Sequence, residues 1–278
     1  MAEDTRTTIP RFEILGTCLH AVDAPLAKRV LRSFLADDAE RQVMTVNLDF
    51  LVLARSNPQF HQTISQSDLT LLDGRPLIWM ARYLGLQTCE RMTGPDLIET
   101  AAAMSADSGA RIFLLGGTPA AAYGTRKYLE RQFPGVQICG VMSPPPADYP
   151  FSPEVDSAIC QRIRATQPDI LFVAFGAPKQ DLWIQEHLGH LGVKVSAGIG
   201  GSFNFLSKLT PRAPRILQHL GLEWAFRLVS EPSRLWKRYL LHDMPFMFAI
   251  IANEAASKLR RRDRTRSLRP AAPRLIDL

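Results

Sequence analysis

The sequence predicts an α/β fold, a Rossmann-like, mostly parallel sheet flanked by helices, with a C-terminal helical appendage. Three observations lead to this prediction. Short apolar runs alternate with segments of helical length as far as Gly201, which is typical of βαβ units. These runs are continuously apolar, as expected of strands buried on both faces of a sheet. After Gly201 the alternation ends and helical sequence follows.

Six runs have the length and the apolar character of buried strands. They are RQVMTVNL (41–48), LTLL (69–72), RIFLLGG (111–117), VQICGV (136–141), DILFVAFG (169–176) and VKVSAGIG (193–200). Amphipathic or alanine-rich segments lie between them and predict the covering helices. We expect helices at 24–36, 57–67, 76–84, 95–107, 119–132, 153–166 and 179–190.

The change of pattern sets the domain boundaries. We expect an α/β domain over residues 1–210, a basic helical appendage over 211–262 and a disordered tail over 263–278, because that tail is rich in charge and proline. Within the appendage, Pro232 and Pro245 should each begin or break a helix.

Composition narrows the class of protein. The chain has 278 residues, 46% hydrophobic and 22% charged, as in a globular protein with a sizeable core. Its cysteines, at 18, 89, 139 and 160, form no CxxC pair, so we expect reduced thiols in a cytosolic compartment. The N-terminus has no apolar signal-peptide core, and FMFAIIA (246–252) is far shorter than the ~20 residues of a spanning helix.

The net charge of +6 lies at one end of the chain. Residues 227–278 hold 12 Lys and Arg against 5 Asp and Glu, a balance of +7. Residues 1–226 hold 21 against 22, a balance of −1. A basic end fits a membrane surface, a nucleic acid or a phosphorylated ligand, and a solvated tail is the alternative.

Polar residues stand where the predicted strands end. Asp73 follows LTLL directly, and Thr45 and Asn47 end the preceding strand. Asp73 is either a turn or capping residue or a catalytic carboxylate, because ligands of α/β sheets bind at the carboxyl ends of strands. Arg91, in RMTGPDL, could pair with a phosphate or with this carboxylate, or could simply form an ion pair on the surface.

Glycines follow the later strands. Such turns let the backbone approach a ligand, and helix N-termini favour phosphate. A doubly wound sheet would bring these turns to one edge. The residues predicted to bind a phosphorylated ligand there are Gly116, Gly117, Gly176, Gly201 and, in the first turn of a helix, Lys179 and Gln180.

Several motifs are missing from the sequence. It contains no GxGxxG, no GxxxxGK[ST], no HExxH and no GxSxG, which disfavours dinucleotide-binding, P-loop, zinc protease and hydrolase sites. It also contains no Asp-x-Asp pair for a divalent metal. We therefore expect no metal and no cofactor, with diphosphate charge met by Arg, Lys and backbone N–H groups.

The order of motifs resembles one family. From about residue 13 to 240 the chain is similar to the WecG/TagA/CpsF glycosyltransferases, glycosyltransferase family 26, most specifically in GAPKQ (176–180) and EW..RL..EP.R (223–234). The resemblance implies an inverting enzyme that moves a sugar from a UDP-sugar to a polyprenyl-diphosphate-linked saccharide. The resemblance also implies that the enzyme acts on the inner face of the cytoplasmic membrane, in the synthesis of exopolysaccharide, capsule, common antigen or teichoic acid.

The resemblance also implies roles for residues. Asp73 matches the proposed base, and Thr45 and Asn47 match residues near the donor and the base. The basic helices of 211–262 match a segment thought to touch the membrane and the lipid diphosphate. The spacing of Arg227, Arg234 and Arg238 would place these three on one helical face. The implied partners are the UDP-sugar, the lipid-linked acceptor and the membrane surface, without nucleic acid; a homo-oligomer is left open.

Other functions remain at this point. A non-catalytic nucleotide-binding module with a basic tail that docks on nucleic acid or membrane would share the glycine turns. A nicotinamide-dependent oxidoreductase is disfavoured by the missing glycine fingerprint. The donor is also open between UDP-N-acetylmannosamine, its uronic acid and UDP-glucose.

Overall fold

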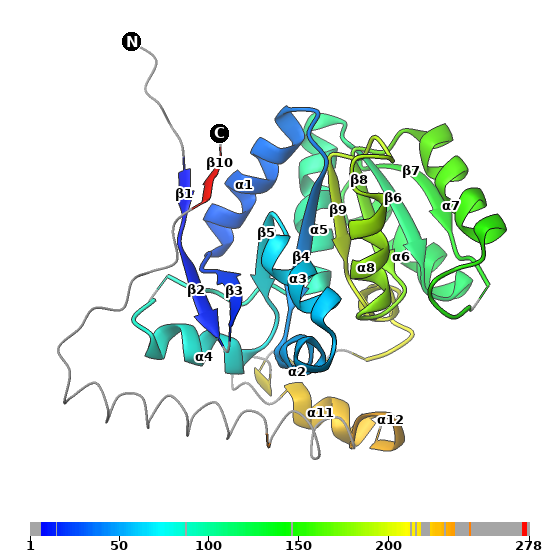
Figure 1. The fold of residues 1–278 in the computed structure, drawn as a ribbon. Helices are drawn as coiled ribbons and strands as arrows, with labels where there is room; N and C mark the ends of the chain where they lie inside the picture. The colour runs from blue at the N-terminus through cyan, green and yellow to red at the C-terminus, as the bar shows by residue number, and fades with distance from the viewer. Residues whose placement is uncertain are drawn as a thin grey trace, which may run out of the picture.

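The computed structural model describes residues 7–14, 16–86, 88–145, 147–211, 213–214, 216–217, 223–230, 232–236, 245 and 274–276. Its centre is a six-stranded sheet in the order β5-β4-β9-β8-β6-β7, and every neighbouring pair is parallel (Figure 1). All six predicted strands are present. They are β4 (Arg41–Val46), β5 (Leu69–Leu72), β6 (Arg111–Gly116), β7 (Gln137–Met142), β8 (Ile170–Ala174) and β9 (Val195–Gly198).

Helices flank this sheet, and the predicted α/β class is confirmed. They are α1 (Ala24–Ala36), α2 (Leu48–Ser56), α3 (Pro58–Gln66), α4 (Arg75–Tyr83), α5 (Gly94–Ser108), α6 (Pro119–Gln132), α7 (Pro153–Thr166), α8 (Lys179–His187) and α9 (Ser202–Leu206). Six of them begin at a side chain that accepts a hydrogen bond from the first turn, which stabilises a helix by about 1 kcal/mol. These N-caps are Asp23, Asn47, Asn57, Thr93, Thr118 and Ser152.

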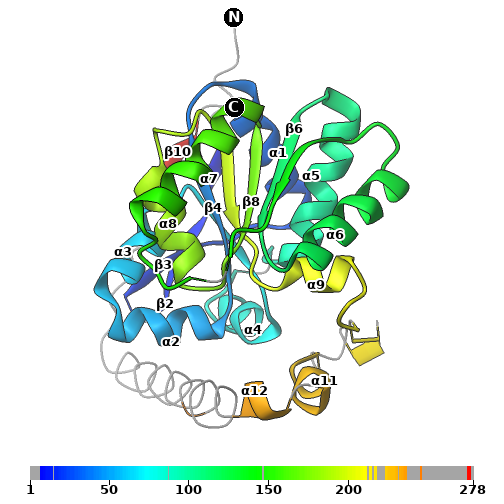
Figure 2. The same cartoon turned by 90° about the vertical axis from the view of Figure 1, so that its right-hand side faces the viewer.

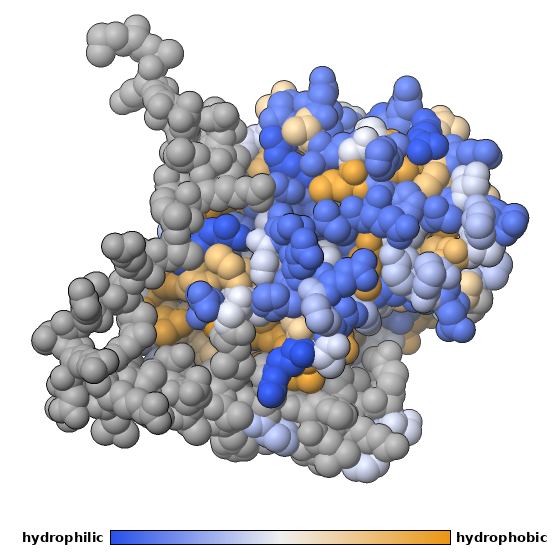
Figure 3. All heavy atoms as spheres, viewed as in Figure 1, coloured by the Kyte–Doolittle hydropathy of each residue, from blue (hydrophilic) through white to orange (hydrophobic). Residues whose placement is uncertain are grey.

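Alternation along the strands divides the core into two faces. In β6, Ile112 and Leu114 pack into the cluster under α1, α5 and α6, whereas Phe113 and Leu115 pack under α7 and α8. Figure 2 shows α5 and α6 on one side of the sheet and α7 and α8 on the other. The side of the α/β body seen in Figure 3 is mostly hydrophilic, because its helices turn their apolar residues inward.

The N-terminal segment differs from the prediction. An antiparallel hairpin joins β2 (Arg11–Ile14) to β3 (Thr17–His20), and β1 (Thr7–Ile9) pairs with β10 (Arg274–Ile276). The short runs of these strands lie outside the βαβ alternation, which is why the pattern did not reveal them. Strand β10 lies within 263–278, so at these three residues the structure differs from the expected disorder.

The appendage is described in part. Two helices, α11 (Glu223–Ser230) and α12 (Pro232–Trp236), follow the α/β body, and Pro232 begins a helix as predicted. Both views place them below the edge of the sheet where α2 and α4 lie (Figures 1 and 2). Most of the predicted basic helices, including Arg238, lies outside the described residues, and the three domain boundaries stay predictions. No helix in the described part of the chain is long and apolar enough to cross a membrane.

Candidate active site

A cavity of about 430 Å³ opens at the carboxyl edge of the sheet. The loops after β6, β7, β8 and β9 line it, together with the first residues of α6 and α8. The structure therefore brings together five of the six residues predicted to bind a phosphorylated ligand at the glycine turns, and these five come from three separate turns. Those that line the cavity are Gly116, Gly117, Gly176, Lys179 and Gly201.

The turn after β6 requires glycine. Gly116 has a φ of +91°, and a Cβ there would lie 2.8 Å from the carbonyl oxygen of Ala174. Gly117 has a φ of +65° and its N–H donates to the same carbonyl at 3.0 Å. The turn is thus held against the end of β8, and its backbone forms one wall of the cavity.

Positive charge is directed at this cavity. Helix α6 begins there, with the Thr118 hydroxyl accepting a hydrogen bond from the N–H of Ala121 at 3.2 Å. Helix N-termini carry a partial positive charge and unpaired N–H groups, which suit an anion. The Lys179 Nζ adds a full charge; it donates to the Ala147 carbonyl at 2.8 Å and lies 5.8 Å from the centroid of the Phe151 ring. The cavity is therefore suited to a phosphorylated ligand beside an aromatic ring.

Gln180 lies behind the cavity and does not line it. Its side chain is buried, and Oε1 accepts hydrogen bonds from the N–H groups of Gly176 at 3.1 Å and Gly200 at 3.0 Å. Gln180 therefore ties the turn after β8 to the turn after β9. Its described contacts position the glycine turns, and direct contact with a ligand stays a prediction.

Thr45 lies in β4, Asn47 follows that strand, and Asp73 follows the neighbouring strand β5. The Thr45 hydroxyl donates to the Gly198 carbonyl at 3.1 Å, and the Asn47 Oδ1 accepts from the N–H of Phe50 at 3.2 Å as the cap of α2. Asp73 continues the pairing of the two strands, with its N–H donating to the Val46 carbonyl at 2.8 Å. All three residues reach the same edge as the cavity, but none lines it. Thr45 and Asn47 are engaged in the fold, and their predicted catalytic roles stay predictions.

Arg91 contacts the candidate base. The N–H of Met92 donates to the Leu72 carbonyl at 3.0 Å, which holds the Arg91 segment beside the end of β5. The Arg91 Nε lies 3.8 Å from the Asp73 Oδ1, and its Nη2 makes a short ion pair with Glu223 of α11. Of the alternatives that the sequence left open for Arg91, the structure shows proximity to the Asp73 carboxylate. The sequence assigned no role to Glu223, although it stands in the EW..RL..EP.R motif.

The remaining predicted arginines are not brought to the site. Arg227 lies in α11 and Arg234 in α12, but their side chains and all of Arg238 lie outside what the structure describes. Their predicted contacts with a diphosphate or a membrane stay predictions.

Sequence reasoning missed a buried acid near this edge. The Asp181 side chain is fully buried against Gly198 of β9, where a Cβ would collide with the carboxyl group. Burial raises the pKa of Asp181 to about 7, against the weaker opposing effect of the Gln180 side chain. A neutral carboxyl group is the form that a buried site without a charge partner favours. The indication available in the sequence was the position of Asp181, directly after the GAPKQ motif.

Among the residues that the structure describes, one group of side chains could hold a metal ion. The ligand atoms of Asp156, Cys160 and His187, between α7 and α8, lie within 4.8 Å of one another. His187 Nε2 lies 2.9 Å from the Asp156 Oδ2, and the Trp183 indole N–H donates to the other carboxylate oxygen at 2.6 Å. Burial lowers the pKa of His187, but contacts with Cys160, the Trp183 carbonyl and Asp156 raise it to about 9. When His187 is protonated, its ion pair with Asp156 satisfies the hydrogen-bonding groups of both side chains without a metal ion. None of these three residues lines the cavity.

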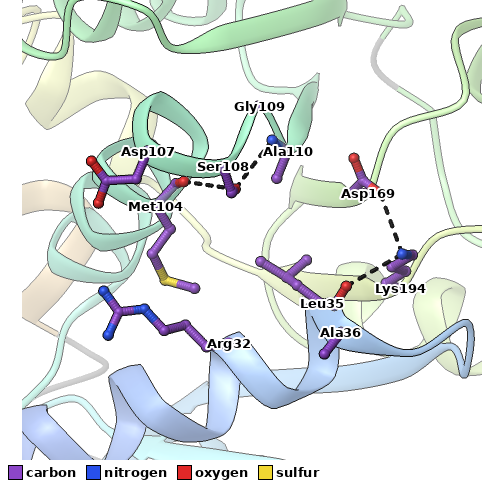
Figure 4. A pocket seen from close by; sticks show the side chains of 10 residues that line it. All are labelled: Arg32, Leu35, Ala36, Met104, Asp107, Ser108, Gly109, Ala110, Asp169 and Lys194. Atoms are coloured by element: carbon purple, nitrogen blue, oxygen red, sulfur yellow. Dashed lines mark hydrogen bonds and ion pairs between the residues drawn. The ribbon is translucent and has the colours of Figure 1, made fainter.

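A second cavity of about 430 Å³ lies at the opposite, amino-terminal edge of the sheet (Figure 4). Its walls include the end of α1, the end of α5 and the residues just before β6, β8 and β9. Lys194 donates there to the Leu35 carbonyl at 3.3 Å and lies 3.8 Å from the Asp169 Oδ1. Of the predicted site residues whose side chains are described, none lines this cavity.

The parallel sheet, with a glycine-built cavity at its carboxyl edge, has the architecture in which α/β proteins bind ligands where the strands end. The chain belongs to the glycosyl transferase WecG/TagA/CpsF family, whose sequence model matches residues 12–261. Over 215 residues it is 28% identical to the N-acetylglucosaminyldiphosphoundecaprenol N-acetyl-beta-D-mannosaminyltransferase of Bacillus spizizenii (strain ATCC 23059 / NRRL B-14472 / W23). The match covers 77% of this chain and 80% of that protein. The resemblance predicted from the motifs is confirmed, and the chain is a glycosyltransferase.

Proposed function

We propose that this glycosyltransferase moves a sugar from a UDP-sugar to a saccharide carried on polyprenyl diphosphate, with inversion, in the synthesis of a bacterial surface polysaccharide. The relative's name describes transfer of an N-acetyl-β-D-mannosaminyl group to N-acetylglucosaminyldiphosphoundecaprenol. The observation that carries the proposal is the position of Asp73, at the same edge of the sheet as a cavity suited to a phosphorylated donor.

The cavity would bind the donor. Backbone N–H groups of the Gly116–Gly117 turn, the start of α6 and the Lys179 ammonium group would face the diphosphate. These groups would also stabilise the charge that develops on the UDP leaving group. The aromatic ring of Phe151 in the same cavity offers a surface on which the uracil ring of UDP could stack.

Asp73 would act on the acceptor side. The acceptor hydroxyl attacks the anomeric carbon as the bond to UDP breaks, and Asp73 accepts the hydroxyl proton. One displacement of this kind inverts the anomeric centre, and it needs no covalent nucleophile. An acceptor anchored in a bilayer would require the protein to work at the membrane surface, where the basic C-terminal segment would face anionic lipid on the inner face.

Release of UDP tests this function directly. Purified protein should release UDP from one member of a panel of UDP-sugars only when a lipid-diphosphate-linked N-acetylglucosamine is added. The same donor should raise the melting temperature, because a ligand that binds the folded state stabilises it by mass action. UDP formed without the acceptor, or no donor that binds, would contradict the proposal.

Transfer should also survive EDTA. The reason is that the sequence has no Asp-x-Asp pair, while Lys179 and the start of α6 supply positive charge at the cavity. The initial rate with EDTA should equal the rate with added Mg²⁺ or Mn²⁺. A strict requirement for either ion would contradict the metal-independent mechanism.

A further inference from the structure

We infer that Glu223 is a positioning residue of the active site, which acts through Arg91 on the candidate base Asp73. The inference rests on the proposed function, because it takes Asp73 as the base. It adds a residue of the C-terminal appendage to the machinery of the α/β body.

The inference begins with three charged side chains in contact. The guanidinium group of Arg91 directs Nη2 to the Glu223 Oε2 and places Nε 3.8 Å from the Asp73 Oδ1. The exposed fractions of the side chains are only 15% for Arg91, 13% for Glu223 and 25% for Asp73. Partly buried ions interact more strongly than surface ions, so this arrangement is expected to be energetically significant.

The geometry of arginine explains what Glu223 does. A guanidinium group presents its N–H groups as a planar fork that binds a carboxylate through two parallel hydrogen bonds. Charge-assisted hydrogen bonds to a carboxylate make it a weaker proton acceptor. Glu223 occupies the Nη2 side of the fork, and the Nε side lies 3.8 Å from the Asp73 Oδ1, a distance beyond an ordinary hydrogen bond. Glu223 thus limits how strongly Arg91 holds the base.

The pair also joins two parts of the chain. Glu223 is the first residue of α11, whereas Arg91 stands between β5 and α5, 132 positions earlier. An ion pair removed this far from solvent is costly to break by deleting one partner, because the other charge is left without it. The base therefore reaches its working geometry only when α11 is seated at the edge of the sheet.

A double-mutant cycle tests the inference. In Glu223→Gln the Arg91 fork should close on Asp73, and kcat should fall by roughly 100-fold, the size typical of a misplaced group. The KM for the donor should stay unchanged, since Glu223 does not line the cavity. The Arg91→Gln/Glu223→Gln variant should be no slower than the slower single variant, because both changes act on one interaction. Glu223→Asp, which keeps the charge, should recover part of the lost kcat.

A matched control removes the same charge elsewhere. Glu130 lies on α6, is paired with Arg126 at 2.7 Å and is about three times as exposed as Glu223, with 44% of its side chain exposed against 13%. Glu130→Gln should keep the wild-type kcat. Wild-type kcat in Glu223→Gln, or losses that multiply in the double variant, would overturn the inference.

A second measurement does not depend on activity. Backbone amides of 223–230 should exchange with solvent faster in Glu223→Gln than in the wild type, and equally fast in Arg91→Gln. A wild-type chain that transfers no sugar would contradict the proposed function. Unchanged exchange in Glu223→Gln would overturn the link between α11 and the base and leave that function standing.

Discussion

The two edges of the central sheet carry cavities of the same volume, about 430 Å³, built in opposite ways. At the carboxyl edge the walls are glycine turns and helix starts, and Lys179 lines the cavity, while Asp73 and Arg91 lie at the same edge of the sheet. At the amino edge the walls are helix ends, and Lys194 is already paired with Asp169 and with a carbonyl.

The difference lies in what each edge leaves for a ligand. Helix starts expose N–H groups toward the carboxyl edge, which attract anions, whereas helix ends present carbonyl groups to the amino edge. Lys194 donates to one such carbonyl, that of Leu35, and lies near the carboxylates of Asp38 and Asp169, so its charge serves the fold. The volume of a cavity therefore does not by itself indicate a binding site. Its walls must also offer hydrogen-bonding or charged groups to a ligand.

The largest effect should come from Asp73. Asp73→Asn keeps the shape of the side chain but cannot accept a proton, so kcat should fall by roughly 10²–10⁴-fold. Binding of the donor, measured by calorimetry, should be nearly unchanged, because Asp73 does not line the donor cavity. A variant with near wild-type kcat would show that another group takes the proton.

Asp181 should make stability at the carboxyl edge depend on pH. Its pKa is about 7 in the folded state and lies at the ordinary low value in the unfolded state. Between these two pKa values the folded protein therefore keeps a proton on Asp181 that the unfolded chain loses. The contribution of Asp181 to the free energy of unfolding is fully present below about pH 4. It is lost as the pH rises toward 7. In urea unfolding, Asp181→Asn should lose less stability than the wild type between these pH values. If the unfolding free energy of the variant changes with pH as in the wild type, the raised pKa of Asp181 is contradicted.

Two glycines give a matched pair across the sheet. Gly116 and Gly109 both have positive φ, but a Cβ at Gly116 meets the Ala174 backbone, whereas one at Gly109 meets nothing within 4 Å. Gly109→Ala should cost about 1–2 kcal/mol of unfolding free energy for its conformation alone. Gly116→Ala should cost more and should weaken donor binding. Equal losses in urea unfolding, or equal donor affinity, would remove the distinction between the two cavities.

Lys194→Met should have the smallest effect. It removes a partly exposed charge whose partners are a carbonyl and surface carboxylates, and such pairs contribute about 0–1 kcal/mol. Initial rates of transfer should stay at the wild-type level. A large loss of activity would show that the amino-edge cavity takes part in function.

The sequence by itself determined the layers of the fold and the edge that carries the site. Runs such as RIFLLGG and DILFVAFG predicted buried strands, and the amphipathic or alanine-rich segments between them predicted helices, because both properties depend on residues close together in the chain. The positive φ of Gly116 also belongs to a local turn, so the glycine turns could be found without coordinates.

Only the tertiary structure decided which of these residues face a ligand and which face each other. It turned Gln180 inward to join two turns, buried Asp181 without a charge partner, and paired Arg91 with Glu223 across 132 positions. It also paired β1 with β10 from the two ends of the chain. Such contacts depend on which elements the folded chain places side by side, and no periodicity within one segment encodes that choice.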